Sequence, residues 1–113
     1  MVMQQGDIFY VNYDPSIGHE QKRYRPAIVL SHDLVQSSSQ MWICAPISTT
    51  KRKYPAYHEL KSTKYIHGKV LLDQVKSLDL IARAINKDSF IERIDKNEFI
   101  DIINRFKLLF DVE

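Results

Sequence analysis

Two polar segments of the sequence carry side chains that could act on a phosphate. The first, residues 18–25, holds a histidine, a glutamate and Arg25, and the second, residues 48–53, holds Ser48 followed by two threonines and three cations. A guanidinium is permanently charged, and its planar donors suit a phosphate on which charge accumulates during phosphoryl transfer. A hydroxyl can hydrogen-bond a phosphoryl oxygen. If the fold brings the two segments together, they could serve phosphodiester chemistry.

Each of these side chains also has an ordinary structural role open to it. Arg25 could be a solvated arginine, Ser48 could cap a turn, and the cations of residues 51–53 could form an exposed loop. The same cations could instead bind backbone phosphates while the nearby Tyr54 stacks on an unpaired base. Residue types alone leave both interpretations open.

The histidines and the single cysteine lack the spacing of a metal site. His32, His58 and His67 are scattered relative to one another and to Cys44, so we predict neither a metal nor a cofactor. Cys44 lies in an apolar stretch, which indicates a buried thiol rather than a reactive one. The sequence has no Gly-rich phosphate loop, nucleophile elbow or helix-turn-helix pattern, which argues against nucleotide hydrolases, serine hydrolases and ordinary repressors.

Short strands are predicted to position the two polar segments. Residues 7–13 are rich in aromatic and β-branched side chains and end at turn residues. Pro26 cannot donate to a ladder, so we expect it at the first residue of a second strand, with Arg25 at the rim. Residues 37–39 are predicted to be a surface loop, and Pro46 indicates an edge or a bulge. Further strands are expected in residues 41–47, 57–60 and 69–75, and one more in residues 76–79 or 81–85.

One helix is predicted, at the C-terminal end. Apolar residues from Phe99 to Phe110 recur at the three and four spacing of a helical face. Asp95 followed by Glu98 resembles a capping box. Short strands with one terminal helix indicate a mainly β (α+β) single domain over residues 1–113, a compact barrel or strongly curved sheet, and argue against a doubly wound fold.

The composition and the N-terminal residues limit which partners and which cellular compartment we expect. A formal charge of +2 is too mild for an extended DNA-coating surface, although a local basic patch could still meet a polyanion. The N-terminal residues show no signal-peptide pattern and no apolar run approaches bilayer length, so we predict a cytoplasmic protein without a membrane partner.

Five short motifs occur in the order found in the MazF/PemK toxin family. Residues 6–11, 14–21 and 25–31 resemble the start of that family, which has a "GD" strand, a "DP..G.EQ" loop and an "RP.(V/I)(V/L)" strand. Residues 45–50 and 72–79 resemble its second catalytic loop and its "DQ(V/I)(K/R)S.D" strand. The similarity covers nearly the whole chain.

The resemblance implies a small SH3-like barrel of the plasmid-maintenance-toxin type with a C-terminal helix, acting as a homodimer. It further implies metal-independent cleavage of single-stranded RNA at short sequence motifs, and a cognate MazE/PemI-like antitoxin whose acidic segment covers the RNA groove. Catalytic roles fall on Arg25, Ser48 and Glu20; many members carry threonine where Ser48 stands, which keeps the hydroxyl. The RNA contacts that we predict are His19, Gln21, Lys22, Thr49, Thr50, Lys51, Arg52, Lys53, Gln74 and Lys76.

Two other functions remain open at this stage. A gyrase-poisoning toxin of the CcdB type shares this barrel, and the fold alone cannot separate the two activities. Arg25 and Ser48 favour the nuclease, because a gyrase binder does not need a phosphate-directed arginine there. The other alternative is a catalytically inactive family member that only binds RNA or an antitoxin.

Overall fold

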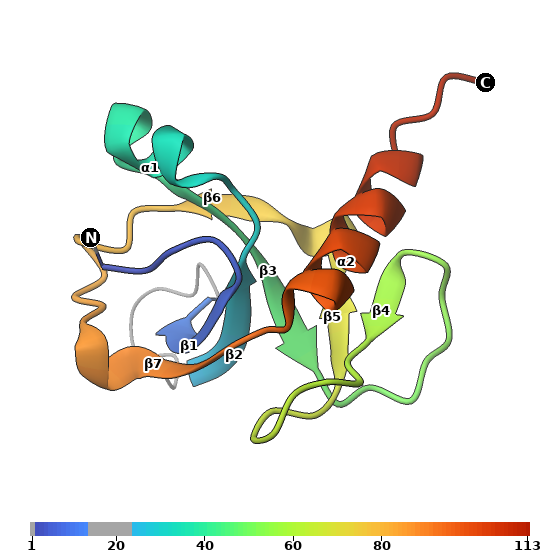
Figure 1. Cartoon of the computed structure of the whole chain (residues 1–113), viewed down its shortest axis with the longest axis horizontal. Helices are drawn as coiled ribbons and strands as arrows, with labels where there is room; N and C mark the ends of the chain where they lie inside the picture. The colour runs from blue at the N-terminus through green and yellow to red at the C-terminus, as the bar shows by residue number, and fades with distance from the viewer. Residues whose placement is uncertain (1, 14–23) are drawn as a thin grey trace, which may run out of the picture.

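A computed structural model describes residues 2–13 and 24–113 of the chain, which form one curled antiparallel sheet and two helices (Figure 1). The strands of this part of the chain are ordered β4-β5-β3-β2-β1-β7, and β6 pairs with β3 beside that path. The elements are β1 (Asp7–Asn12), β2 (Tyr24–Val29), α1 (Asp33–Ser39), β3 (Trp42–Ser48), β4 (Tyr57–Glu59), β5 (Lys69–Leu71), the 3-10 turn η1 (Leu72–Gln74), β6 (Lys76–Leu78), the 3-10 turn η2 (Lys87–Ser89), β7 (Phe90–Arg93) and α2 (Lys96–Leu108).

Strand β3 is the centre of the sheet. One of its edges pairs with β2, while the other pairs with β6 through residues 42–44 and with β5 through residues 47–48. Strands β4 and β7 end the path, and no pairing joins them within the described residues. The mainly β class and the C-terminal helix are therefore confirmed. The sheet is strongly curved like a barrel, but it is open between β4 and β7.

Both faces of the curled sheet are apolar, because successive residues of a strand point to opposite sides. On one face, Phe9 and Val29 pack in a cluster with Trp42 and Leu78. On the other face, Ile8 and Ile28 pack in a second cluster that includes Ile102 of α2. Figure 1 shows α2 beside β3 and β5, and Phe99, Ile103 and Phe106 of this helix also pack against the second cluster.

Helix α2 begins where the sequence predicts. Asp95 is its N-cap, and its carboxylate accepts hydrogen bonds from the amides of Asn97 and Glu98 at 3.1 and 3.3 Å. The predicted capping box is wrong in its second half, because the Glu98 carboxylate bonds to His58 instead of reaching back to the N-cap amide. Phe110, expected on the buried face, lies beyond the helix and is exposed. Neither helix of the described chain is long and apolar enough to cross a membrane.

Residues 37–39 belong to helix α1, so the predicted surface loop is wrong. The Nδ1 atom of His32 accepts a hydrogen bond from the Leu34 amide at 3.0 Å and caps this helix. Gln36 is buried, and the Ser31 hydroxyl donates to its side-chain oxygen at 2.6 Å. Leu34 and Val35 are exposed, so the helix has no apolar stripe that a sequence pattern could reveal.

The two prolines lie deeper in the sheet than predicted. β2 begins at Tyr24, which makes Pro26 its third residue, opposite Tyr10 of β1. Pro46 lies in the central strand, opposite Ala27, and not at an edge. The β2–β3 ladder ends at this Ala27–Pro46 pair. Pro26, which has no N–H to donate, lies one residue beyond that ladder, so the ladder loses no hydrogen bond there.

The strand predictions for residues 69–85 are confirmed in part. The run from Lys69 forms a strand only as far as Leu71 and then enters the turn η1. β6 occupies residues 76–78, the first of the two positions considered for the next strand. Strand β7 was not predicted; it pairs with β1 across a register shift between Ile8 and Phe9.

Candidate functional site

Arg25 lies near the start of β2, opposite a buried residue of β1. Its partner in β1 is Val11, which is fully buried in the first apolar cluster. The Arg25 side chain is itself half-buried. Arg25 was predicted to stand just before its strand, and the structure instead makes it the second residue of β2. Since the ladder fixes its backbone, the guanidinium extends from a rigid element rather than from a loop.

Ser48 is the last residue of β3 and is also half-buried. Its hydroxyl oxygen accepts a hydrogen bond from the Thr50 amide at 3.1 Å, and its backbone pairs with Lys69 of β5. A Cβ atom at Gly68 would lie 2.5 Å from the Ser48 carbonyl oxygen, and Gly68 has a φ of +138°. Glycine at position 68 is therefore required for β5 to pack this closely on Ser48.

The pairing of β2 with β3 brings Arg25 and Ser48 to the same end of the sheet. The strands run antiparallel, and the last pair of their ladder is Ala27 with Pro46. Continued two residues beyond its last pair, the same register would set Arg25 opposite Ser48. Opposite residues of an antiparallel pair point to the same face and have Cβ atoms about 5 Å apart. A phosphate at this end of the strand pair would be within reach of both side chains.

Gln74 and Lys76 lie along the other edge of β3. Lys76 is the first residue of β6 and pairs with Cys44. Its ammonium lies 4.5 Å from the centroid of the Tyr13 ring. The carbonyl oxygen of Gln74 accepts a hydrogen bond from the Tyr13 hydroxyl at 2.8 Å, while the Gln74 side chain is exposed. Of the two predicted contacts, Lys76 has the more constrained side chain.

The predicted exposed loop between β3 and β4 is confirmed, and we call residues 49–53 the basic loop. The Lys69 ammonium donates to the carbonyl oxygens of Thr50 and Arg52 at 3.2 and 2.9 Å. The Arg52 amide donates to the Thr50 hydroxyl at 3.2 Å. The basic loop therefore has a defined path beside Ser48.

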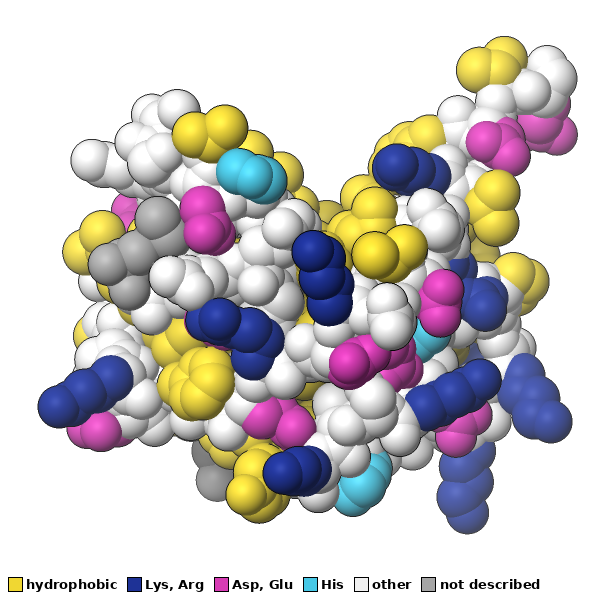
Figure 2. All heavy atoms as spheres, viewed as in Figure 1, with side chains coloured by type: hydrophobic (Ala, Val, Ile, Leu, Met, Phe, Trp, Pro, Cys, Tyr) yellow, Lys and Arg dark blue, Asp and Glu magenta, His cyan; other side chains and the backbone are white. Residues whose placement is uncertain are grey.

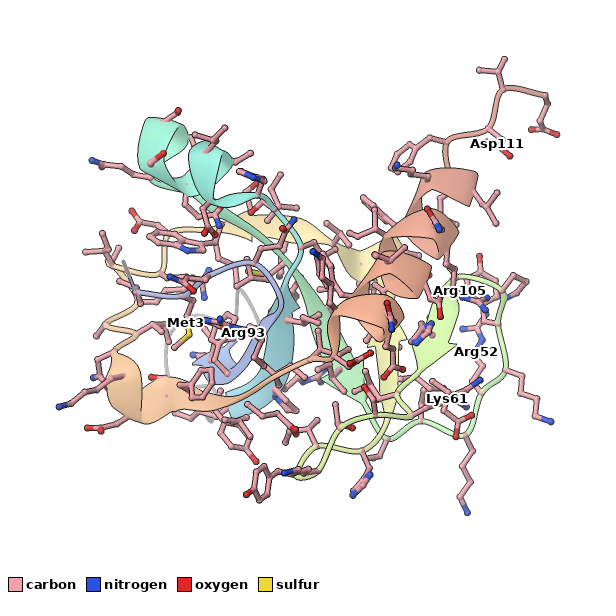
Figure 3. All side chains as sticks on the ribbon, viewed as in Figure 1. Met3, Arg52, Lys61, Arg93, Arg105 and Asp111 are labelled. Carbon is pink, nitrogen blue, oxygen red and sulfur yellow. The ribbon has the colours of Figure 1, made fainter. Side chains whose placement is uncertain are left out.

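The cations of the basic loop point away from the protein. Lys51, Arg52 and Lys53 are all exposed, and the Arg52 guanidinium lies 5.0 Å from the centroid of the Tyr54 ring. Figure 3 shows Arg52 on the same flank as Lys61 and Arg105, and Figure 2 shows Lys and Arg side chains gathering on that flank. This flank can attract a polyanion.

Four predicted site residues lie outside the described residues. They are His19, Glu20, Gln21 and Lys22, all within residues 14–23. The roles assigned to them, including Glu20 as a catalytic residue, stay predictions.

A buried carboxylate that the sequence analysis assigned only to a capping box organises the loop before β5. Glu98 accepts hydrogen bonds from the amides of Lys61 and Ser62 at 2.9 and 2.8 Å and from the Ser62 hydroxyl at 2.5 Å, and it also bonds His58 Nε2 at 2.8 Å. Burial by itself raises the pKa of the Glu98 carboxyl, but the hydrogen bonds from Ser62, His58 and Lys61 outweigh it and hold the pKa below its ordinary value. Glu98 is thus a charged anchor for residues 61–62.

A second carboxylate anchors the rest of this loop. The side chain of Glu92 in β7 accepts hydrogen bonds from the amides of Lys64, Tyr65 and Ile66, each at 2.9 Å. Burial opposes ionisation here too, yet these amides lower the pKa of Glu92. The loop leads directly to Gly68, so both carboxylates help to hold the glycine against Ser48.

Replacing Glu98 by glutamine is expected to lower the free energy of unfolding by about 2 kcal/mol near neutral pH, because hydrogen bonds to a charged acceptor contribute more than neutral ones. The folded-state pKa of Glu98 is depressed, so its contribution is present above an unfolded-state pKa of about 4.3 and is lost as the pH falls through the folded-state value. Urea unfolding as a function of pH measures both effects. Glu113→Gln, at an exposed terminal position, is the matched control. Identical acid-side pH slopes for wild type and Glu98→Gln would contradict this role.

The single cysteine is buried and free, as predicted. Burial raises the pKa of the Cys44 thiol, which keeps it in the un-ionised, poorly nucleophilic form. Among residues 2–13 and 24–113, no three His, Cys, Asp or Glu side chains cluster as metal ligands would.

The curled sheet with its covering helix, and an arginine and a serine at one end of its central strands, define a small, mainly β protein with a polar site suited to an anion. The chain belongs to the PemK-like, MazF-like toxins of type II toxin–antitoxin systems, since the model of that family matches residues 4–110.

Relatives and solved structures agree with this membership. The Escherichia coli K12 protein named endoribonuclease toxin MazF is 37% identical over 86 residues, which cover 76% of this chain and 77% of the relative. The endoribonuclease toxin ChpB of the same strain is 40% identical over 88 residues, covering 71% and 72%. The crystal structure of a MazE–MazF complex from Deinococcus radiodurans matches with a TM-score of 0.81 at 25% identity, covering 96% of each chain.

Proposed function

We propose that this chain is an endoribonuclease toxin that cleaves single-stranded RNA in the cytoplasm. The substrate's own 2′-oxygen forms a bond to the adjacent phosphorus as it loses its proton, and the bond from phosphorus to the 5′-oxygen breaks as that oxygen takes up a proton. The products are a 2′,3′-cyclic phosphate and a free 5′-hydroxyl. The proposal is supported by the register of β2 and β3, which directs Arg25 and Ser48 toward one face at one end of the two strands.

Arg25 is assigned to the charge that develops on the phosphorus centre. A guanidinium is a permanent cation with planar donors, so Arg25 is suited to stabilise negative charge rather than to act as a free base. Ser48 is assigned to orient a non-bridging oxygen, with its hydroxyl proton available because its oxygen already accepts from the Thr50 amide. Glu20 stays a predicted catalytic residue, and Glu20 or His19 could act as the general base or acid.

The basic loop is assigned to the RNA strand on either side of the cleaved phosphate. Its lysines supply charge for backbone phosphates, and the Tyr54 ring beside Arg52 offers a surface on which an unpaired base can stack. Single-stranded RNA is the natural ligand of such a surface, because its bases are free to leave the stack.

The reaction is proposed to need no metal ion. Purified protein is expected to cut a long unstructured RNA at the same rate with and without EDTA, and the fragments should carry 5′-hydroxyl ends that polynucleotide kinase can label directly. Loss of cleavage in EDTA, restored by adding a divalent cation, would exclude the metal-free mechanism. RNA left intact under all conditions would favour the gyrase-poisoning or the inactive alternative.

We also propose that the chain is a homodimer and that an antitoxin binds it. Exposed apolar side chains support contact with a second copy; they include Leu34 on α1, Leu108 at the end of α2 and Phe110 just beyond it. Figure 2 shows the surface hollowed between these two helices. Sedimentation equilibrium tests the dimer. An acidic antitoxin segment is expected to compete with RNA for the site, and simultaneous binding of both to one protomer face would contradict that expectation.

A further inference from the structure

Tyr13 links the end of β1 to β3 and to the turn η1, which precedes β6. It follows β1 directly and is only 3% exposed. Its hydroxyl lies 3.0 Å from the carbonyl oxygen of Cys44 in β3 and 2.8 Å from that of Gln74, just before β6. A single phenolic proton is shared between these two acceptors. The Tyr13 side chain therefore spans from β1 to the seam between β3 and β6.

The ring of Tyr13 also holds the ammonium of Lys76. The nitrogen lies 4.5 Å from the ring centroid, well inside the range of a cation–π contact. No carboxylate of residues 2–13 or 24–113 forms a salt bridge with Lys76. Burial raises the pKa of the Tyr13 hydroxyl, so the ring stays neutral and attracts the cation without cancelling its charge. Lys76 is thus oriented by a neutral partner, and its remaining N–H donors stay available to an anion.

We propose that Tyr13 is a positioning residue, which holds Lys76 at the site so that the ammonium binds a backbone phosphate of the RNA. The inference rests on the proposed function, because it takes RNA as the ligand of Lys76. The ring restricts the ammonium, and the hydroxyl bonds the carbonyl oxygen of Gln74, two residues before β6 begins at Lys76. A lysine whose side chain is already restricted loses less conformational entropy when it binds.

The contact between Tyr13 and Lys76 can be measured without RNA. A ring current is expected to shift the side-chain methylene protons of Lys76 upfield in NMR spectra of the wild type and of Tyr13→Phe, which keeps the ring. The shift should disappear in Tyr13→Leu. Methylene shifts of Lys76 that do not change in Tyr13→Leu would overturn the proposal.

The effect on binding is tested by a double-mutant cycle with an RNA whose 2′-hydroxyls are replaced by hydrogen, so that it binds without being cut. Tyr13→Leu is expected to weaken binding about fivefold, as a lost cation–π contact would. Once Lys76→Met is present, Tyr13→Leu should weaken binding no further. The slope of log Kd against log salt should fall by about 0.7 for Lys76→Met, the value for one phosphate contact on a single strand.

A second cycle with Lys51→Met is the matched control, because Lys51 is an exposed cation of the basic loop. Because Tyr13 does not contact Lys51, the factors by which Tyr13→Leu and Lys51→Met each raise Kd should multiply in the double variant. Multiplying effects in the Lys76 cycle, or wild-type affinity in a folded Tyr13→Leu, would overturn the positioning role while leaving the proposed function intact. A wild-type protein that neither binds nor cuts RNA would instead overturn the proposed function together with this inference.

Discussion

Replacing Arg25 by alanine is expected to reduce the rate of RNA cleavage about a hundredfold or more, which is typical for the loss of one preorganised donor to a developing charge. The loss should appear mainly in kcat, because the interaction is strongest when charge accumulates on the phosphorus centre. Cleavage of a defined RNA under single-turnover conditions gives the rate directly. The fold should survive, since Arg25 lies at the end of β2 and is only half-buried.

Two variants control for charge and for fold. Arg25→Lys keeps the positive charge but loses the planar pair of donors, so partial activity is expected. Lys107→Ala removes one exposed cation from α2, away from β2, and should cut at the wild-type rate. Full activity in Arg25→Ala would refute the assignment of Arg25.

Replacing Gly68 by alanine should have the largest effect on stability, a loss of about 4 kcal/mol from backbone strain together with overpacking. The φ of +138° disfavours any side chain, and the new Cβ atom would meet the Ser48 carbonyl oxygen. Relief of this clash must move β5 or the end of β3, so the remaining folded protein should also cleave RNA more slowly. Urea unfolding and the cleavage rate measure the two effects.

Gly6→Ala separates strain from collision. Gly6 has a φ of +89°, but the nearest atom to an added Cβ, Cγ2 of Ile94, lies at 3.6 Å, an ordinary contact distance. Gly6→Ala should therefore lower the free energy of unfolding only through backbone strain, by about 2 kcal/mol. Equal losses of stability in the two variants would show that the approach of Gly68 to Ser48 is not a constraint.

The rival functions make different predictions for the same variants. A gyrase-poisoning toxin would inhibit supercoiling by purified gyrase, and its activity would not depend on Arg25. An inactive member would bind RNA with the basic loop but leave it intact. Because the fold serves more than one activity, these assays, and not the architecture, distinguish the alternatives.

Elements with a strong local pattern could be predicted from the sequence. β1 has a run of aromatic and β-branched residues, and α2 has an apolar stripe and an N-cap, so both were found. α1 was not predicted, because its apolar side chains are exposed and it is stabilised by the His32 cap and by the buried Gln36. β7 was not predicted, because its end residues are exposed and its middle residues only half-buried, so it has no apolar pattern. Its pairing with β1 joins distant parts of the chain.

The same distinction applies to the site. Arg25 and Ser48 could be singled out because each stands at the end of an apolar run and matches a family motif. Tyr13, Gly68 and Glu98 could not, because their roles depend on contacts across the sequence. The Tyr13 hydroxyl meets a carbonyl 61 residues away, and Glu98 meets a histidine 40 residues away. Such contacts follow from the topology and leave no local signal.

A crystal structure with an uncleavable RNA tests the meeting of Arg25 and Ser48 at one phosphodiester most directly. Sequencing the 5′ ends of cleaved transcripts would first identify the preferred motif, and the RNA would then carry a 2′-deoxy substitution at the cut site. We expect the phosphate after that position to lie within hydrogen-bond distance of both the Arg25 guanidinium and the Ser48 hydroxyl. A bound RNA whose scissile phosphate touches neither group, in either protomer, would contradict the assignment.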